Sequence, residues 1–165
     1  MNVEIKKKNY TRNEVIDMAE AILLEGEPVA MPLTHTFTDG MYIRQIEMPA
    51  GAILTSMIHN TNHPFVVVKG KCKVYDGDDV IEIEAPYNGI TPANTRRLLL
   101  IEEDTVWITY HATELKDVDE IEKEIINPEY QNKLIDKQKA TENKKISRSI
   151  NHINKKGENL WLGQQ

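Results

Sequence analysis

The apolar pattern in the middle of this chain changes every few residues, and this spacing restricts the fold more than any other feature. Between about Met31 and Ala112, short apolar or alternating runs are separated by turn residues such as Pro49-Ala50-Gly51 and Asp76-Gly77. Alternation with a period of two predicts strands, and frequent turns favour an antiparallel barrel or sandwich. We expect seven strands in a largely sequential order: Tyr42–Met48, Ile53–His59, Phe65–Lys69, Lys71–Tyr75, Val80–Glu84, Arg96–Ile101 and Thr105–His111.

One segment of this region places two histidines at a spacing typical of a metal site. It reads Gly51-x5-Met57-x-His59-x3-His63-x6-Gly70. This segment resembles the first signature of the cupin superfamily, G-x5-H-x-H-x3/4-E-x6-G, in which two His and one Glu point into a small barrel and hold a divalent metal. In the comparison Met57 stands at the first His position, His59 at the second and His63 at the Glu position.

A second segment resembles the other cupin signature, G-x5-P-x-G-x2-H-x3-N, more in spacing than in identity. It reads Pro86-x5-Pro92-x-Asn94-x2-Arg97. Asn94 replaces a glycine, which is tolerable because Asn accepts left-handed backbone angles. Arg97 stands where the fourth ligand, a His, is expected, and a guanidinium has no lone pair to give to a metal.

From roughly Pro32 to Thr113 the chain is also similar to small cupin-like proteins of the type found in phage genomes. The resemblance implies a mainly β fold with a single cupin, a small antiparallel β-barrel or jelly roll, with an N-terminal helix and C-terminal helices. The residues that carry it are His35, Phe37, Gly40, Tyr42, Arg44, Ile46, Pro49-Ala50-Gly51, His59, His63, Gly70, Ala85-Pro86-Tyr87, Arg96-Arg97, Trp107, Thr109 and His111.

The motif register and strand alternation predict a metal site inside the barrel. Ile53, Thr55, Met57 and His59 share one parity of their strand, and the motif places this set inside. Two neutral imidazoles, those of His59 and His63, are plausible ligands for Zn, Fe, Ni or Mn. Because a catalytic site normally has three protein ligands, we expect His111 as the third, with His35 as an alternative.

Other polar residues are expected to bind a small molecule beside this metal. Arg97 would hold an anionic group such as a carboxylate or phosphate, Tyr42, Tyr87 and Thr109 would add hydrogen bonds, and Met57 faces the same cavity. No catalytic residue is predicted. The structural alternatives are that the histidines bond to one another or to the backbone, that Arg97 pairs with Glu102 or Glu103, and that Met57 fills a gap in the core.

Both ends of the chain have helical periodicity. Residues 11–24 combine an S/T-x-x-E capping box at Thr11 and Glu14 with an apolar stripe, and this helix should pack outside the barrel. After Thr113 an apolar stripe predicts a helix that Asn127-Pro128 breaks, and residues 130–153 form a second candidate. We therefore divide the chain into an N-terminal helical segment (1–30), the cupin barrel (31–113) and a C-terminal helical extension (114–165).

Composition restricts the class of partner. Residues 1–127 carry 12 Lys and Arg against 22 Asp and Glu, whereas residues 128–165 carry 8 against 4. An acidic body argues against nucleic acid. A lone cysteine, Cys72, fits a reducing compartment, and the N-terminus has no apolar run for a signal peptide or a membrane span. We expect a cytoplasmic protein, in the host cytoplasm if phage-encoded, that forms a homodimer and does not bind a membrane.

Two functions fit these observations. The first is a metal- and/or small-molecule-binding cupin with a pocket inside the barrel for an anionic ligand, for which fold analogy suggests isomerase, epimerase or oxygenase chemistry. The second is a non-catalytic phage accessory protein that sequesters a ligand or docks a host or self partner through the barrel and the helical ends. The sequence does not decide whether the chain is an enzyme.

Overall fold

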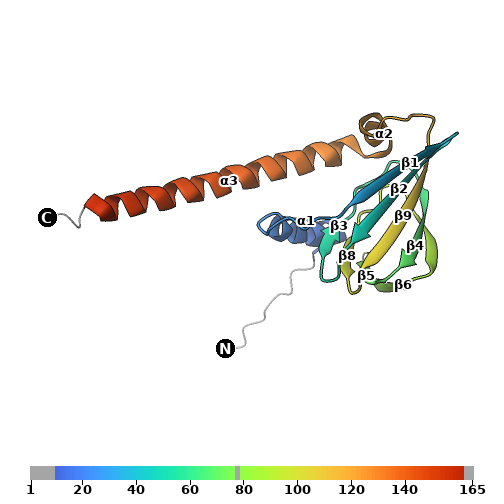
Figure 1. Cartoon of the computed structure of the whole chain (residues 1–165), viewed down its shortest axis with the longest axis horizontal. Coiled ribbons are helices and arrows are strands. Elements are labelled where there is room, and N and C mark those ends of the chain that lie inside the picture. Colours follow the sequence, from blue (N-terminus) through green and yellow to red (C-terminus); the bar gives the residue numbers. More distant parts are fainter. Residues whose placement is uncertain (1–9, 77–78, 162–165) are drawn as a thin grey trace, which may run out of the picture. The chain divides into compact units, whose positions relative to one another are not determined.

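The computed structural model describes residues 10–76 and 79–161, with the side chains of 134, 135 and 149–161 left out. The first nine residues of the expected N-terminal segment and the last four of the C-terminal extension lie outside this range. Two compact units can be separated, one reaching to Tyr130 and one beginning at Gln131. The described elements are α1 (Arg12–Leu23), β1 (Leu33–Thr38), β2 (Met41–Met48), β3 (Ile53–Thr55), β4 (His63–Lys69), β5 (Lys71–Tyr75), β6 (Val80–Glu84), β7 (Tyr87–Thr91), β8 (Leu98–Ile101), β9 (Thr105–Ala112), α2 (Val118–Ile125) and α3 (Pro128–Trp161) (Figure 1).

The strands form two antiparallel sheets, as the mainly β jelly-roll prediction requires. One sheet has the order β1-β2-β9-β4-β7 and the other the order β3-β8-β5-β6. The prediction of sequential strand order was wrong, because β9 pairs with both β2 and β4. The expected closure into a barrel was also wrong, since the two sheets are not joined by a hydrogen-bonded ladder. They pack face to face instead, as in a sandwich.

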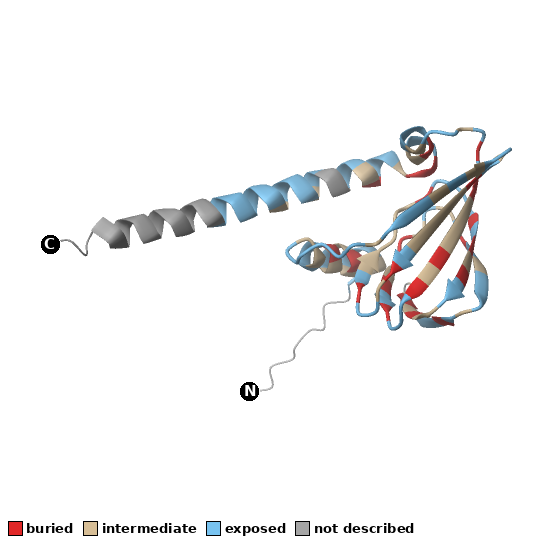
Figure 2. Cartoon of the chain, in the orientation of Figure 1, coloured by how far each residue is buried: buried red, intermediate tan, exposed pale blue. Residues whose placement is uncertain are grey.

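The apolar core lies between the two sheets. Both contribute buried side chains, and the Phe65 and Trp107 rings stack with their centroids 4.3 Å apart. Burial alternates along the strands, and Figure 2 shows the buried bands crossing the β-sheets. The core residues are Met48, Ala52, Phe65, Val67, Cys72, Val74, Ile83, Leu99, Ile101 and Trp107. This packing keeps the inward face of each strand dry, so a polar group on that face needs a partner.

Two strands were not predicted, and a third is shorter than predicted. β1 and β7 are edge strands of the larger sheet, and Asn88-Gly89 in β7 is a pair more typical of turns. Gly89 suits this strand because a Cβ there would come within 2.8 Å of the Phe65 ring. The predicted strand Ile53–His59 stops at Thr55, so strict alternation does not extend to His59.

The predicted N-terminal helix is confirmed, and a buried polar network ties it to the sheets. Thr11 and Glu14 form the capping box. Glu20, 3% exposed, accepts hydrogen bonds from the Thr55 hydroxyl at 3.0 Å and the Tyr130 hydroxyl at 2.7 Å, and pairs with the Arg96 guanidinium. Burial and the bond to Glu20 raise the pKa of Tyr130 to about 12. A single carboxylate therefore joins α1, the β3 edge and the start of α3.

The helices after the sheets follow the predicted break. Asp117 caps α2, whose side chains Ile121 and Ile125 are buried with Tyr42 and Ile126 in a second core cluster. α2 ends at Ile125 and α3 begins at Pro128, as expected from Asn127-Pro128. α3 is longer than the predicted helix at residues 130–153. None of the helices in the described residues is long and apolar enough to cross a membrane.

Replacing Gly70 with alanine should destabilise the fold far more than the same change at Gly51. Both glycines have a positive φ, +85° and +84°, which costs an alanine about 1 kcal/mol. At Gly70 the added Cβ would also meet the Asp104 carbonyl oxygen at 2.4 Å, whereas at Gly51 nothing lies within 4 Å. In urea denaturation we expect Gly70→Ala to lose about 2 kcal/mol more than Gly51→Ala. Equal losses would contradict this account of the β4–β5 turn.

Replacing Glu20 with alanine should lower the free energy of unfolding by about 3 kcal/mol, because the buried Arg96 guanidinium then loses a carboxylate partner. The Tyr130→Phe variant removes one hydrogen bond to the same carboxylate and should cost about 1 kcal/mol. Chemical denaturation monitored by tryptophan fluorescence measures both. A cost for Glu20→Ala no larger than that for Tyr130→Phe would show that the network does not anchor α1.

Candidate metal centre

Three histidines from separate segments meet at one end of the larger sheet. His63 begins β4, His111 lies near the end of β9, and His59 precedes β4 in the connection from β3. Their ring centroids are 4.3 Å (His59–His63), 5.1 Å (His59–His111) and 4.6 Å (His63–His111) apart. One ring nitrogen from each lies within 4.8 Å of the others. The predicted three-histidine group is therefore assembled, and it could hold a metal ion.

The position of His59 depends on its backbone, since β3 ends before it. His59 forms an isolated antiparallel bridge with Ile126, between α2 and α3. Its carbonyl accepts a hydrogen bond from the Asn94 amide at 2.8 Å. Asn94 has φ 59°, so the expected left-handed conformation at this motif position is confirmed. The second cupin-like segment thus holds the first one in place.

Burial keeps the three imidazoles neutral. The side chains of His59, His63 and His111 are 9%, 3% and 2% exposed. Desolvation, reinforced by the neighbouring imidazoles, lowers the pKa of His59 to about 4 and that of His111 to about 3, and burial also lowers the pKa of His63. Groups with such low pKa values are poor general bases at neutral pH. They do keep the lone pairs that a metal requires.

In His63 and His111, one ring nitrogen makes a hydrogen bond and the other ring nitrogen is available to bind a metal ion. The His63 Nδ1 lies 3.4 Å from the Thr61 carbonyl oxygen, and the His111 Nε2 lies 3.1 Å from the Thr109 hydroxyl. Among the residues that the structure describes, the buried His111 Nδ1 has no hydrogen-bond partner. Outer hydrogen bonds of this kind orient metal-binding imidazoles. A buried ring nitrogen without a partner is unfavourable, and a metal ion would satisfy it.

Tyr42 packs beside this group rather than pointing to solvent. It is fully buried, stacks on His111 with a centroid distance of 5.9 Å, and its hydroxyl lies 2.6 Å from the His35 Nδ1. His35, the alternative third donor, therefore bonds Tyr42 and is not part of the three-histidine group. Thr109, opposite Arg44 in the ladder, bonds the His111 ring. Both Tyr42 and Thr109 orient histidines in this structure.

Arg97 is buried near the histidines and already has a carboxylate partner. Its guanidinium pairs with Asp76 at 3.3 Å, donates to the Thr91 hydroxyl at 3.2 Å and lies 5.9 Å from the Phe65 ring centre. Thr91 lies opposite His63 in the β4–β7 ladder. The alternative that Arg97 pairs with an acidic residue is confirmed, but the partner is Asp76 and not Glu102 or Glu103. Glu102 pairs with Lys73 instead.

The remaining predicted ligand residues lie at different places. Met57 is half-buried and packs against the second core cluster with Tyr42 and Ile126, which matches the alternative that it fills the core. Tyr87 begins β7, is 38% exposed and stacks on Phe65. The structure does not bring Tyr87 into the three-histidine group.

Two residues that interact with the site residues, Asp76 and Arg44, were not predicted from the sequence as part of the site. Asp76 was read as a turn residue, and no local pattern links it to an arginine twenty-one positions later. Arg44 could have been found, because it shares the inward parity of Tyr42 in a strand that was correctly predicted. Cys72 is buried, and this burial raises its pKa to about 11, so its thiol is a poor nucleophile.

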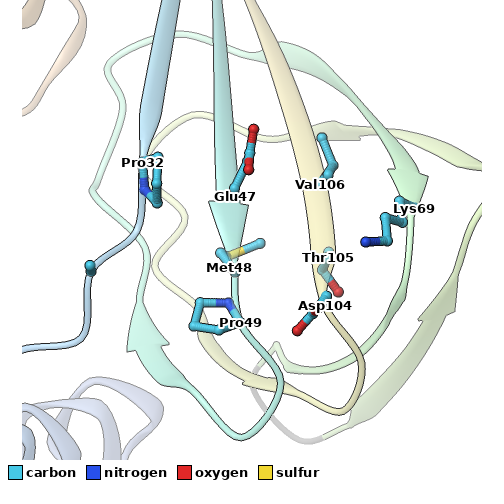
Figure 3. Close-up of a pocket in the computed structure, with 9 residues that line it drawn as sticks. Pro32, Glu47, Met48, Pro49, Lys69, Asp104, Thr105 and Val106 are labelled. Atoms are coloured by element: carbon cyan, nitrogen blue, oxygen red, sulfur yellow. The ribbon is translucent and has the colours of Figure 1, made fainter.

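A pocket of about 220 Å³ lies at the other end of the same strands. Figure 3 shows Glu47, Met48, Lys69 and Thr105 around it. In the β2–β9 ladder Met48 is opposite Thr105, whereas Tyr42 is opposite His111. The pocket lining contains no imidazole or thiol. The candidate metal centre and this pocket are therefore separate features.

No protein-family model and no curated protein matches the sequence. Solved structures similar to the chain include a cupin-2 domain containing protein from Shewanella frigidimarina (TM-score 0.42, 12% identity, 62% of this chain and 98% of that chain covered). A cupin superfamily protein from Desulfitobacterium hafniense has a TM-score of 0.45 and 12% identity, with 56% of this chain and 85% of that chain covered. The cupin domain of Schizosaccharomyces pombe Cnp3 has a TM-score of 0.42 and 21% identity, with 58% of this chain and 69% of that chain covered. These three structural neighbours are described as cupin-domain or cupin superfamily proteins.

The metal-free protein should lose stability as its buried histidines are forced to take up protons. The folded pKa of His59 is about 4 against an ordinary value of 6.5, so between these pH values the unfolded chain binds protons that the folded chain excludes, and unfolding becomes easier as pH falls. For His111 the effect continues to about pH 3. Between pH 7 and 4, the variant His59→Gln should lose on the order of 3 kcal/mol less than the parent. Urea denaturation at each pH measures the difference, and parallel pH curves would contradict the burial of neutral imidazoles.

Proposed function

We propose that this protein binds one divalent transition metal ion through His59, His63 and His111 and uses it to hold a small anionic molecule. The observation that carries this proposal is the convergence of three buried, neutral imidazoles, with the Nδ1 atom of His111 left without a hydrogen-bond partner. Purely structural histidines are expected to satisfy both ring nitrogens. Three protein ligands with further positions open is the usual arrangement of a catalytic or ligand-binding metal site.

The donor set restricts the metal. Three imidazoles and no carboxylate suit Zn, Fe or Ni, and Mn is the least favoured of the four metals expected, since it prefers oxygen donors. The ring nitrogens lie up to 4.8 Å apart, so binding requires small rotations of the imidazoles toward one another. His59 lies in a connection rather than in a strand, and its ring can make most of this adjustment.

An anionic ligand is supported by the charges around the centre. A divalent ion bound by neutral imidazoles keeps its full positive charge, and Arg97 is close enough to His63 to lower its pKa, after the larger effect of burial. The Arg97 guanidinium is held by Asp76 and Thr91. Its positive charge would attract an anionic ligand, and its remaining N–H groups could donate hydrogen bonds to that ligand. The buried Arg97 Nε has no hydrogen-bond partner in the described ranges 10–76 and 79–161.

The metal proposal predicts stoichiometric binding that depends on the three histidines. Metal-free protein titrated with Co²⁺ should develop the visible absorption of a low-coordinate cobalt site at one ion per chain. Replacing both His59 and His63 with alanine should weaken binding at least about 100-fold, because one imidazole remains.

The matched control for this experiment is His35→Ala. His35 is a half-buried histidine on the same sheet but outside the three-histidine group, so its loss should leave the affinity within about 3-fold. Binding that survives the loss of both His59 and His63, or that disappears with His35 alone, would contradict the proposed ligand set. Circular dichroism of each variant distinguishes loss of ligands from loss of fold.

The non-catalytic alternative shares this centre but assigns it a different role. In that case the protein sequesters its ligand or docks a partner, and no bound molecule is converted to a product. A homodimer, a cytoplasmic location and a phage origin are further parts of the proposal that rest on composition and on the resemblance to phage cupin-like proteins. The domain boundaries at 30 and 113 are proposed on the same basis.

A further inference from the structure

Arg44 lies on the inward face of β2, between residues that line the interior. Tyr42 and Met48 on this face are buried, and Ile46 packs against the main core. In the ladders Arg44 is opposite Thr109 on one side and His35 on the other. Tyr42, two residues away, is opposite His111. Arg44 therefore occupies the row of inward positions next to the row that contains the metal ligands.

The distance between these rows suits the length of an arginine side chain. Residues two apart on one face of a strand are separated by about 7 Å, and an extended arginine reaches a similar distance. The positive charge of Arg44 is also felt by all three imidazoles: it adds to the effect of burial in lowering the pKa values of His59, His63 and His111. The guanidinium is thus in the vicinity of the centre.

Arg44 differs from the other interior arginines in the lack of a partner for its side chain. Arg12 and Arg97 both pair with Asp76, and Arg96 pairs with Asp17 and Glu20. Arg44 is half-buried, and its guanidinium makes no hydrogen bond or ion pair with any residue in the part of the chain that the structure describes. The half-buried guanidinium has no counter-charge among the described residues, so it is free to pair with an anion supplied from outside the chain.

We propose that Arg44 binds the carboxylate group of the small molecule held at the three-histidine centre. This inference rests on the proposed function and identifies which residue recognises the ligand. A guanidinium offers two parallel N–H donors that match the two oxygens of a carboxylate. A molecule that places a carboxylate on Arg44 and a neighbouring oxygen toward the histidines spans the separation between the two rows.

The available donors favour a carboxylate over a phosphate. A phosphate dianion has more acceptor oxygens than one guanidinium can satisfy and usually requires several cations. The second interior guanidinium nearby, that of Arg97, is already paired with Asp76. A small monocarboxylate needs one fork of donors, which Arg44 supplies alone.

The test measures binding of glycolate to the full chain by calorimetry, in the metal-free protein and in the Co²⁺-loaded protein. Glycolamide, of the same shape without the charge, is the ligand control. The Arg44→Gln variant should weaken glycolate binding at least about 10-fold in the cobalt protein while leaving Co²⁺ binding in place. The matched control is Gln45→Ala. Gln45 is next to Arg44 in the same strand and lies on its outward side, so this variant should change glycolate affinity less than about 2-fold.

The outcomes separate this inference from the proposed function. If the parent protein does not bind Co²⁺, the proposed metal site is wrong. The titration of the metal-free protein with glycolate then tests Arg44 alone, and loss of glycolate binding in Arg44→Gln would support its proposed role. Glycolate affinity unchanged by Arg44→Gln, or no glycolate binding by the parent in either form, would overturn it. Tighter and Arg44-dependent binding of inorganic phosphate would overturn the assignment to carboxylates, as would equal affinity for glycolamide.

Discussion

The burial of three imidazoles at one end of a two-sheet sandwich is the constraint on which the chemistry of this protein depends. Imidazole in water is protonated below about pH 6.5, but desolvation between these sheets lowers the pKa of His111 to about 3. Because the rings stay neutral, they can lie 4.3 to 5.1 Å apart without repelling one another. The same burial makes an unpaired ring nitrogen costly. A metal ion would meet both conditions, since it binds neutral imidazoles and would satisfy their lone pairs.

The arrangement around the histidines explains why distant segments of the chain have to fold together. His63 and His111 are carried by β4 and β9, which are neighbours in the larger sheet, whereas His59 is positioned by contacts from the α2–α3 connection and from Asn94. The second core cluster, which includes Tyr42 and Ile121, packs α2 close to this end of the sheet. The site therefore forms only when α2 and the sheets are assembled.

His59 and His63 could be identified from local sequence because their spacing is a local property. The motif placed His59 and His63, even though the predicted strand through Ile53 to His59 ends at Thr55. His111 was expected as the third ligand that a catalytic metal site normally has. Pairings between distant strands have no local signal: β9 inserts between β2 and β4, and the Asp76–Arg97 pair joins two turns. β7 was hidden by Asn88-Gly89, where glycine is needed for the Phe65 ring and not for a reversal. No local pattern in the sequence marks Glu20 as the buried partner of Arg96.

X-ray absorption spectroscopy of the metal-loaded protein tests the central claim most directly, because it counts the imidazoles on the ion. The account predicts a first shell with nitrogen at about 2.0–2.1 Å for zinc and outer-shell scattering from three imidazole rings, in protein carrying one ion per chain. A shell of oxygen donors without imidazole scattering, or scattering from fewer than three rings, would contradict it.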